Sequence, residues 1–139
     1  MELGDFSGCK LALFFGDAIL VYERDNFEGI PYRGLWDLPG GGREGSETPE
    51  QCVLRELTEE FSIALTPSRL TLQEIYQAPI DGRTAYFFMA ELLEGELQSI
   101  KLGAEGRRWQ LMPITEFIRH KKAIPHLREL VEKNLANGY

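Results

Sequence analysis

Residues 40–63 read GGGREGSETPEQCVLRELTEEFSI, and this stretch decides both the fold around it and the chemistry. Three consecutive glycines come first, and a helical pattern follows after a short polar segment. Thr48 suits the N-cap position, and Gln51 completes a capping box with it. Pro49 suits the first helical position, so we expect a helix over residues 49–61 behind a glycine turn.

The expected helix has two different faces. At about 100° per residue, Glu59 and Glu60 lie within roughly 60° of Glu56, one on each side. A separate face gathers the apolar side chains of Val53, Leu54, Leu57 and Phe61. One face therefore packs on a sheet, while the other presents three carboxylates that repel one another by roughly 0.2–0.5 kcal/mol per pair.

Such a cluster of carboxylates is usually a solvent-exposed acidic face without a specific role. The alternative interpretation is a magnesium-binding site. Mg²⁺ binds through a few carboxylates together with the phosphates of a substrate. Glycines let the backbone approach an ion or a phosphate, because they carry no Cβ. The glycine turn and the acidic helix together favour a cation site that also receives a phosphate.

The same stretch resembles the signature of the Nudix hydrolases. The LPGG segment of residues 38–41, which leads into it, and the ETPEQ segment within it resemble the MutT-like branch of that family. The matching positions are Gly41, Glu47, Arg55, Glu56, Leu57, Glu59, Glu60 and Ile63. The single departure is Ser62, where the family usually has glycine. Serine there costs about 1 kcal/mol if the left-handed conformation is kept, so we expect a slightly strained or altered helix end.

The resemblance implies hydrolysis of a nucleoside diphosphate linked to another group, with Mg²⁺ as the cofactor and Mn²⁺ as a substitute. It implies that the metal is held by carboxylates and one carbonyl, those of Glu56, Glu59, Glu60 and Gly41. By the same resemblance Arg55 orients the glutamates by ion pairing, and Glu47 lies in the outer shell. The substrate-binding candidates are the glycines Gly40, Gly41 and Gly42, together with Arg24 and Glu47.

Two further roles are assigned by resemblance. The base that activates the attacking water is either Glu105, in the loop LGAEGRRW, or Glu56. Arg24 resembles a phosphate-contacting arginine of MutT-like enzymes, and Arg33 is a weaker choice for that role. For Glu105 and Arg24, an exposed loop glutamate and a structural arginine stay open as alternatives.

Other reactive side chains have plainer interpretations. Aromatic residues that could contact a nucleobase are Tyr32, Tyr76, Tyr86 and Phe88, although aromatic residues in strands are more often core residues. His120 and His126 have no partner at metal-ligand spacing, so we expect surface or packing positions for both. Cys52 is expected to be a small helix residue and not a nucleophile.

Strand and helix patterns fill the rest of the chain. Strands are expected over residues 9–15, 18–23, 70–78, 84–93 and 107–112, and further helices over residues 114–122 and 125–136. Residues 24–34 are polar and rich in turn formers, so a loop is expected there. Hairpin-like connections without steady strand–helix alternation predict an α/β (α+β) fold. We expect one domain over residues 1–139, with a mixed β-sheet sandwiched between α-helices and a loop–helix–loop motif of the Nudix type.

The composition argues against several classes of partner. A net charge of −7 disfavours a nucleic acid polymer or an anionic membrane, and it means that a phosphorylated substrate needs a cation. Cys9 and Cys52 match neither a disulfide framework nor a zinc pattern. No signal-peptide or membrane-spanning pattern is found, so we expect a cytoplasmic protein, as a monomer or homodimer.

The sequence leaves three functional hypotheses open. The leading one is a MutT-like pyrophosphohydrolase of nucleoside triphosphates, with oxidised dGTP as the first compound to test. The second is hydrolysis of another diphosphate, such as an ADP-sugar, a dinucleotide or an inositol pyrophosphate. The third is a non-catalytic module that binds a nucleotide or a protein. Phosphate release with and without Mg²⁺ distinguishes the module from the enzymes.

Overall fold

The computed structural model describes residues 5–136, and its elements follow the expected order along the chain. The strands are β1 (Gly8–Phe15), β2 (Ala18–Glu23), β3 (Trp36–Asp37), β4 (Gly40–Gly42), β5 (Leu72–Gln77), β6 (Thr84–Glu91) and β7 (Arg108–Pro113). The helices are α1 (Pro49–Phe61), the 3₁₀ helix η1 (Pro67–Arg69), α2 (Glu94–Gln98), α3 (Ile114–Phe117) and α4 (Pro125–Ala136).

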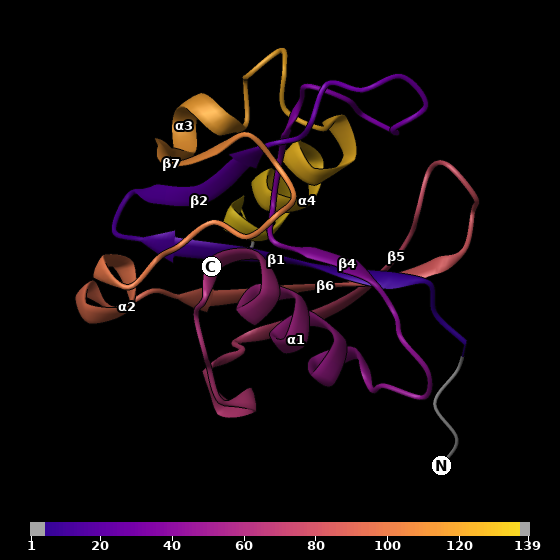
Figure 1. The fold of residues 1–139 in the computed structure, drawn as a ribbon, viewed down its shortest axis with the longest axis horizontal. Helices are drawn as coiled ribbons and strands as arrows, with labels where there is room; N and C mark the ends of the chain where they lie inside the picture. Colours follow the sequence, from indigo (N-terminus) through magenta and orange to yellow (C-terminus); the bar gives the residue numbers. More distant parts are fainter. Residues whose placement is uncertain (1–4, 137–139) are drawn as a thin grey trace.

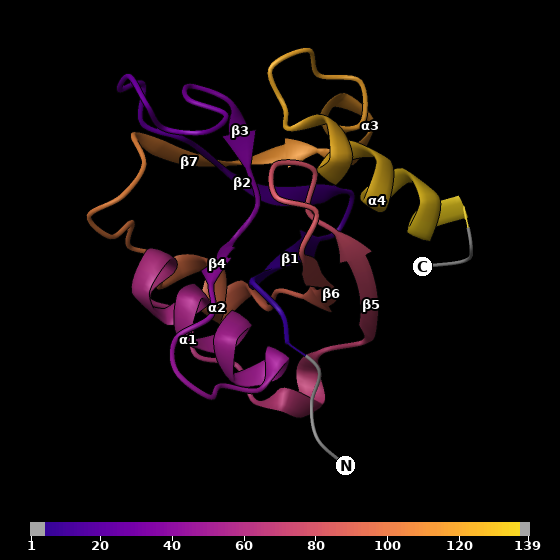
Figure 2. The same ribbon diagram turned by 90° about the vertical axis from the view of Figure 1, so that its right-hand side faces the viewer.

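One mixed sheet contains all seven strands. Its main order is β3-β2-β1-β6-β5, with β4 paired to β1 and β7 paired to β2. β1 and β2 form an antiparallel hairpin, whereas β1 and β6 run parallel. Figures 1 and 2 show α1 on one face of the sheet and α4 on the other. The expected fold, a mixed sheet between helices, is therefore confirmed.

Each face of the sheet has its own apolar core. Successive side chains of a strand point to opposite faces, so β6 places Phe88 in the core under α1 and Phe87 in the core under α4. The face of α1 that was expected to be apolar contributes Val53, Leu57 and Phe61, all fully buried. Burial of each such side chain stabilises the fold by roughly 1.5–3 kcal/mol. These cores fix α1 against β1 and leave its acidic face free.

The ends of α1 follow the expected chemistry. The Thr48 side chain accepts a hydrogen bond from the backbone N–H of Gln51, and the Gln51 side chain accepts one from the Thr48 N–H, which closes the capping box. At the other end Ser62 has φ 60° and ψ 31°, a left-handed conformation, and its N–H donates to the carbonyl of Thr58. Serine therefore keeps the left-handed conformation usual for glycine at this helix end, and the strain expected from it stays a prediction.

The glycine segment differs from the expected turn. Residues 40–42 form the short strand β4, antiparallel to the start of β1. Gly40 has φ +143°, and a Cβ there would lie 2.1 Å from the carbonyl oxygen of Cys9. Only glycine can therefore make this close pairing of β4 with β1.

The helix expected over residues 114–122 is also shorter, because it ends at Phe117. Beyond it the backbone pairs with Trp36, whose N–H donates to the carbonyl of Lys122 and whose carbonyl accepts from the N–H of Ile124. Those bonds require an extended chain, which a helix cannot supply. The short helices α2 and η1 were not expected from the sequence.

The structure also bears on the expectations for membrane-spanning helices and for the two cysteines. None of the helices in residues 5–136 has the length and apolarity needed to cross a bilayer. Cys9 and Cys52 are free thiols, both buried, with their sulfur atoms 3.1 Å apart beneath the carbonyl of Gly41. Cys52 is thus the small buried helix residue that was expected, but its contact with Cys9 was not predicted.

Candidate active site

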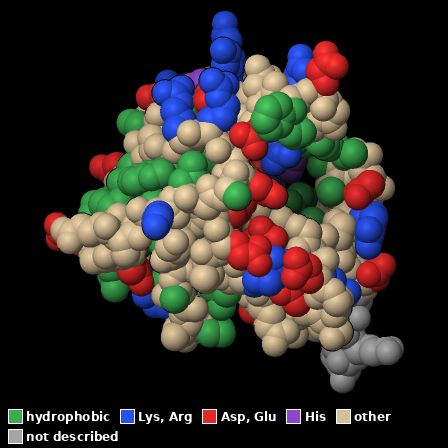
Figure 3. Space-filling model, in the orientation of Figure 1, with side chains coloured by type: hydrophobic (Ala, Val, Ile, Leu, Met, Phe, Trp, Pro, Cys, Tyr) green, Lys and Arg blue, Asp and Glu red, His purple; other side chains and the backbone are tan. Residues whose placement is uncertain are grey.

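A hollow of about 420 Å³ lies between the acidic face of α1, the strand β4 and the loop before β7. It is lined by Lys10, Tyr22, Arg24, Gly40, Gly41, Gly42, Glu44, Glu56, Glu59, Glu60, Ala104 and Glu105. In Figure 3 acidic side chains gather over α1, with basic side chains among them, beside a hollow. The structure thus brings together the metal, base and phosphate candidates that the sequence indicated, whereas Arg33 is exposed and does not line this hollow.

The glycines of β4 lie directly against two carboxylates of α1. The N–H of Gly40 donates to Oε1 of Glu60 at 2.8 Å. A Cβ on Gly41 would lie 2.6 Å from the carboxyl carbon of Glu56. This approach leaves no room for a side chain at Gly41, so the backbone and the two carboxylates form one cradle.

Arg55 holds the rest of the acidic cluster in place. Its Nη1 donates to Glu56 at 2.9 Å and to Glu59 at 3.1 Å. Its Nε donates to Glu47 at 2.7 Å, and its Nη2 donates to the carbonyl of Gly42 at 2.8 Å. The hydrogen bond from Arg55 lowers the pKa of Glu47. Glu47 does not line the hollow; it binds Arg55 and accepts a hydrogen bond from the N–H of Glu44, which does line it, as an outer-shell residue would.

Two of the carboxylates are poorly solvated. Burial raises the pKa of Glu60 to about 8, although the charge of Lys10 and the Gly40 N–H oppose this shift. Burial also raises the pKa of Glu56, against the opposing effect of Arg55. Carboxylates withheld from water and close to one another gain most from a nearby cation.

A buried ionic network supports the other side of the hollow. Oδ2 of Asp37 accepts hydrogen bonds from Lys10 at 2.9 Å, from Arg24 at 3.0 Å and from the hydroxyl of Tyr22 at 3.1 Å. Burial alone would raise the pKa of Asp37, but Lys10 and Arg24 reverse this effect and its pKa is lowered. Sequence reasoning missed Asp37 and Lys10. The available signal was an aspartate between Trp36 and Leu38, because a charge within an apolar segment needs a partner.

The loop that carries Glu105 is docked at two points. The N–H of Gly103 donates to the carbonyl of Glu60 at 2.8 Å, and a Cβ there would lie 2.4 Å from the carbonyl oxygen of Glu59. On the other side, the N–H of Gly106 donates to Oδ2 of Asp25 at 3.1 Å. Glu105 is therefore held across the hollow from α1.

An aromatic hollow of about 340 Å³ adjoins the first one and shares Lys10 and Arg24 with it. The ring of His126 lies between Tyr32 and Tyr76, with centroids 5.8 and 5.7 Å away. Burial lowers the pKa of His126, and its packing position is confirmed. Tyr32 has φ 54°, which is costly for a bulky residue and is typical of functional sites.

The other two aromatic candidates lie elsewhere. Tyr86 and Phe88 are 8% and 1% exposed and belong to the core under α1. The hypothesis that they could contact a nucleobase is therefore wrong, and their interpretation as core residues is confirmed. His120 lies near the turn after α3, where its Nδ1 accepts from the N–H of Lys122.

The donor set at the cradle suits a hard divalent cation. Within residues 5–136 no three or more Asp, Glu, His or Cys side chains are arranged so that together they could hold a metal ion. Arg55 binds Glu56 and Glu59, and the Gly40 N–H binds Glu60. The residues that line the hollow nevertheless include the carboxylates of Glu56, Glu59 and Glu60, and Mg²⁺ and Mn²⁺ prefer oxygen ligands of this kind. Because Gly41 has no Cβ, its backbone lies close to the Glu56 carboxylate, and the types of donor at this hollow fit such an ion.

Comparison with known proteins shows which family this chain resembles. Residues 11–133 match the model of the NUDIX domain family. The chain is 40% identical over 68 residues to an 8-oxo-dGTP diphosphatase of Proteus vulgaris, a match that covers 49% of this chain and 61% of that protein. It is 35% identical over 85 residues to an ADP-ribose pyrophosphatase of Methanocaldococcus jannaschii, which covers 58% of this chain and 47% of that protein.

The fold is also similar to solved structures. The MutT protein from Methanosarcina mazei Go1 superposes with a TM-score of 0.77 at 19% identity, over 96% of each chain. This likeness concerns the fold alone. The chain spans 61% and 47% of the length of the two relatives named above. Since the family match extends over most of the chain and includes the cradle, α1 and the loop of Glu105, the chain belongs to the Nudix family.

Proposed function

We propose that the protein hydrolyses a diphosphate bond in nucleoside diphosphates linked to another group, with Mg²⁺ as cofactor. The observation that carries this proposal is the meeting of α1 carboxylates, the β4 glycines and Glu105 at one hollow. Nucleoside triphosphates are the leading substrate class, and oxidised dGTP is the first compound to test, as the name of the Proteus vulgaris relative supports. An ADP-sugar is the second class, as the name of the archaeal relative supports.

The cation would be held by Glu56, Glu59 and Glu60 with the carbonyl of Gly41. When bound, it neutralises phosphate charge and polarises the phosphorus centre. This contribution is needed because the chain itself carries a net charge of −7. Mn²⁺ serves as a substitute, since it takes the same oxygen ligands.

The chain's own residues position the reactants. Lys10 and Arg24 are the basic residues that line the hollow, and both are ion-paired to Asp37. In this proposal they contact the phosphates. Glu105 accepts a proton from the attacking water, and Glu56 is the alternative base. Arg55 keeps Glu56 and Glu59 oriented between turnovers. Catalysis of this kind is mostly positioning and charge stabilisation.

We propose that the nucleoside of the substrate binds in the aromatic hollow. Tyr32 and Tyr76 offer ring faces to a base, while Lys10 and Arg24 connect this hollow to the cradle. The left-handed backbone of Tyr32 supports a function for this residue, because strained residues of this kind cluster at active sites and ligand-binding sites.

One sheet joins the two ends of the described chain, which supports a single domain over residues 1–139. β7 pairs with β2 along its whole length, and α4 packs on the same sheet. We propose that this domain acts as a monomer or homodimer, which light scattering coupled to gel filtration measures directly.

The test is a phosphate-release screen over nucleoside triphosphates, nucleotide sugars and dinucleotides, at neutral and alkaline pH, with Mg²⁺ or with a chelator. Glu59→Gln is expected to lower turnover strongly, and Glu105→Gln to lower kcat with little change in KM. Glu132→Gln is the matched control, because Glu132 is exposed on α4.

Turnover that survives chelation contradicts the metal mechanism, and an unchanged kcat in Glu105→Gln assigns the base to Glu56. Binding of a nucleotide without turnover of any compound in the screen supports a non-catalytic module instead.

A further inference from the structure

Two buried cysteines lie directly beneath the cradle. Cys9 in β1 and Cys52 in α1 are free thiols, 3% and 0% exposed, and their sulfur atoms are 3.1 Å apart. The same sulfur atoms lie 3.8 and 3.9 Å from the carbonyl oxygen of Gly41. Neither thiol lines the catalytic hollow, so the proposed hydrolysis makes no direct use of this pair.

Two sulfur atoms in contact can undergo a reaction that a single buried thiol cannot. An isolated buried cysteine behaves as a small apolar residue and is chemically inert. When a peroxide oxidises one sulfur of a pair, the neighbouring thiol is already in place to form a disulfide. The sulfur atoms of Cys9 and Cys52 need to approach each other by only about 1 Å to reach the length of a disulfide bond.

The reaction balances with hydrogen peroxide as the co-reactant. The first sulfur attacks the O–O bond, so that an S–O bond forms, the O–O bond breaks, and the thiol proton leaves with the other oxygen as water. The second sulfur then attacks the sulfenic sulfur, so that the S–S bond forms, the S–O bond breaks, and a second water leaves with the second thiol proton. The two thiols lose two electrons in total, and the peroxide gains them. A dithiol reductant reverses the change by thiol–disulfide exchange.

We propose that Cys9 and Cys52 are a modification site, which hydrogen peroxide converts into a reversible disulfide that lowers cation binding and turnover at the cradle. Gly41 lines the hollow and contacts both sulfur atoms, so a peroxide molecule that enters the hollow is one residue away from them. The effect on turnover rests on the proposed function, whereas formation of the disulfide does not.

The strand side of the pair is fixed by the sheet. Cys9 is in register with Gly41 on one neighbouring strand and with Tyr86 on the other. The sulfur atoms must therefore close by rotation of their side chains and by a shift of α1, in which Cys52 lies one turn before Glu56. The carboxylate of Glu56 has little spare room, because a Cβ on Gly41 would lie 2.6 Å from its carboxyl carbon. A shift of α1 toward β1 thus displaces Glu56 from its place in the cradle.

A second effect acts in the opposite direction and is smaller. Oxidation removes the S–H groups near the carbonyl oxygen of Gly41, which makes that oxygen more available to a cation. A thiol is a weak donor and these contacts are long, so the gain is small. A misplacement of about 1 Å in a catalytic group can lower a rate about 100-fold. Because rotation of the side chains takes up part of the closure, we expect the disulfide to lower kcat about tenfold.

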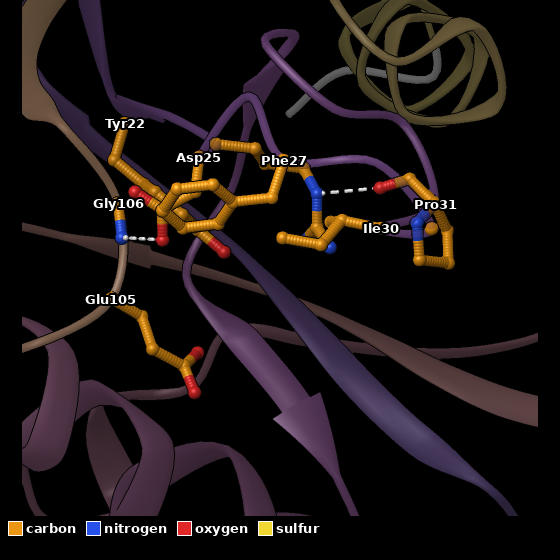
Figure 4. Close-up of a pocket in the computed structure, with 9 residues that line it drawn as sticks. Tyr22, Asp25, Phe27, Ile30, Pro31, Glu105 and Gly106 are labelled. Atoms are coloured by element: carbon orange, nitrogen blue, oxygen red, sulfur yellow. Dashed lines mark hydrogen bonds between the residues drawn. The ribbon is translucent and has the colours of Figure 1, made fainter.

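The other wall of the hollow has anchors of its own. Figure 4 shows Glu105 on this wall, next to the hydrogen bond of 3.1 Å from the N–H of Gly106 to Asp25. Lys10 and Arg24 are held by buried ion pairs. The proposed base and phosphate contacts are therefore retained, and KM is expected to change less than about twofold.

The test treats the full chain with hydrogen peroxide and then with dithiothreitol. After peroxide, intact mass spectrometry is expected to show the loss of both thiol hydrogens. Mn²⁺ binding, measured by calorimetry without substrate, is expected to weaken about tenfold, in parallel with kcat. Tm is expected to rise by roughly 5–15 °C, because the bond links residues 43 positions apart and constrains the unfolded chain. Dithiothreitol is expected to restore all of these values, and a higher Tm with a lower kcat distinguishes the disulfide from general oxidative damage.

The control variants are Cys9→Ala and Cys52→Ala, each of which removes one sulfur atom of the pair. Both are expected to keep the activity of the reduced protein and to lose the response to peroxide. Circular dichroism checks that each variant folds, and either one alone is a sufficient control. Oxidation of the three methionines adds oxygen to the mass and is not reversed by dithiothreitol, so it is recognised separately.

The outcomes separate this inference from the proposed function. Thiols that stay free after peroxide overturn the modification site, and so does a response to peroxide that persists in both alanine variants. A disulfide that leaves kcat and Mn²⁺ binding unchanged overturns the effect on the cradle and leaves the hydrolase intact. Weaker Mn²⁺ binding in the oxidised protein, without turnover of any compound in the screen, supports the modification site and overturns the hydrolase.

Discussion

Replacing Gly41 by alanine is the sharpest way to perturb the cradle without disturbing the fold. The added Cβ would lie 2.6 Å from the carboxyl carbon and from Oε2 of Glu56. Those atoms are the mobile end of a side chain, so they can withdraw. The same substitution at Gly40 is different in kind, because its Cβ would lie 2.1 Å from a backbone oxygen of β1.

The size of the effect follows from that distance. Ordinary van der Waals contact begins near 3.4 Å, so the Glu56 carboxylate must withdraw by roughly 0.8 Å from its place in the cradle. A misplacement of about 1 Å in a catalytic group can lower a rate about 100-fold. We therefore expect Gly41→Ala to reduce kcat by about two orders of magnitude, with a loss of stability below about 1 kcal/mol.

The assay is phosphate release at saturating Mg²⁺, with urea unfolding measured in parallel. Gly95→Ala is the matched control, because it makes the same chemical change in α2 with nothing within 4 Å of the new Cβ. Gly40→Ala, unlike Gly41→Ala, is expected to lower the stability of the fold, because the new Cβ would clash with the backbone carbonyl oxygen of Cys9 in β1. Full activity in Gly41→Ala would refute the claim that Glu56 works from the position seen in this structure.

Three other predictions concern stability. Because burial raises the pKa of Glu60 to about 8, its proton is held more tightly in the folded state. Stability in metal-free buffer should therefore fall by about 1 kcal/mol per unit as pH rises from about 5 toward 8. Glu60→Gln should remove most of this slope in urea titrations, and an unchanged slope would contradict the assignment. Ser62→Gly should raise stability by about 1 kcal/mol, since Ser62 is left-handed; a lower Tm would show that the serine is not strained. Asp37→Ala should cost about 3–5 kcal/mol, because it leaves Lys10 and Arg24 without their buried partner; a loss below about 1 kcal/mol would show that the network contributes little.

The sequence predicts α1 to the residue because local chemistry fixes both of its ends. The capping box of Thr48 acts within four residues, and the left-handed turn at Ser62 acts within one helical turn. The acidic face of α1 is equally local, since it depends only on helical spacing. The metal candidates could therefore be named before any tertiary structure was known.

Features that depend on distant partners could not be predicted in the same way. The helix after β7 stops early because residues 122–124 pair with Trp36, far back in the chain. Cys9 meets Cys52 across 43 positions of sequence, and Gly106 meets Asp25 across 81. Local propensity contains no information about such pairings, so the contact between the thiols and the contact between the two loops emerge only from the fold.

The ion pairs of Asp37 are an intermediate case. A buried aspartate requires a cation, so the need for a partner could be read from the sequence. The identity of the partner cations could not be predicted, because Lys10 lies on strand β1 and Arg24 follows strand β2, both distant from Asp37 in sequence.

The most direct test of the account is a crystal structure of the protein soaked in Mn²⁺, with anomalous scattering recorded at the manganese edge. The account predicts a peak within coordination distance of Glu56, Glu60 and the carbonyl of Gly41, which disappears in crystals of Glu56→Gln. A peak elsewhere, or none at millimolar Mn²⁺, would contradict the claim that this cradle holds the catalytic cation.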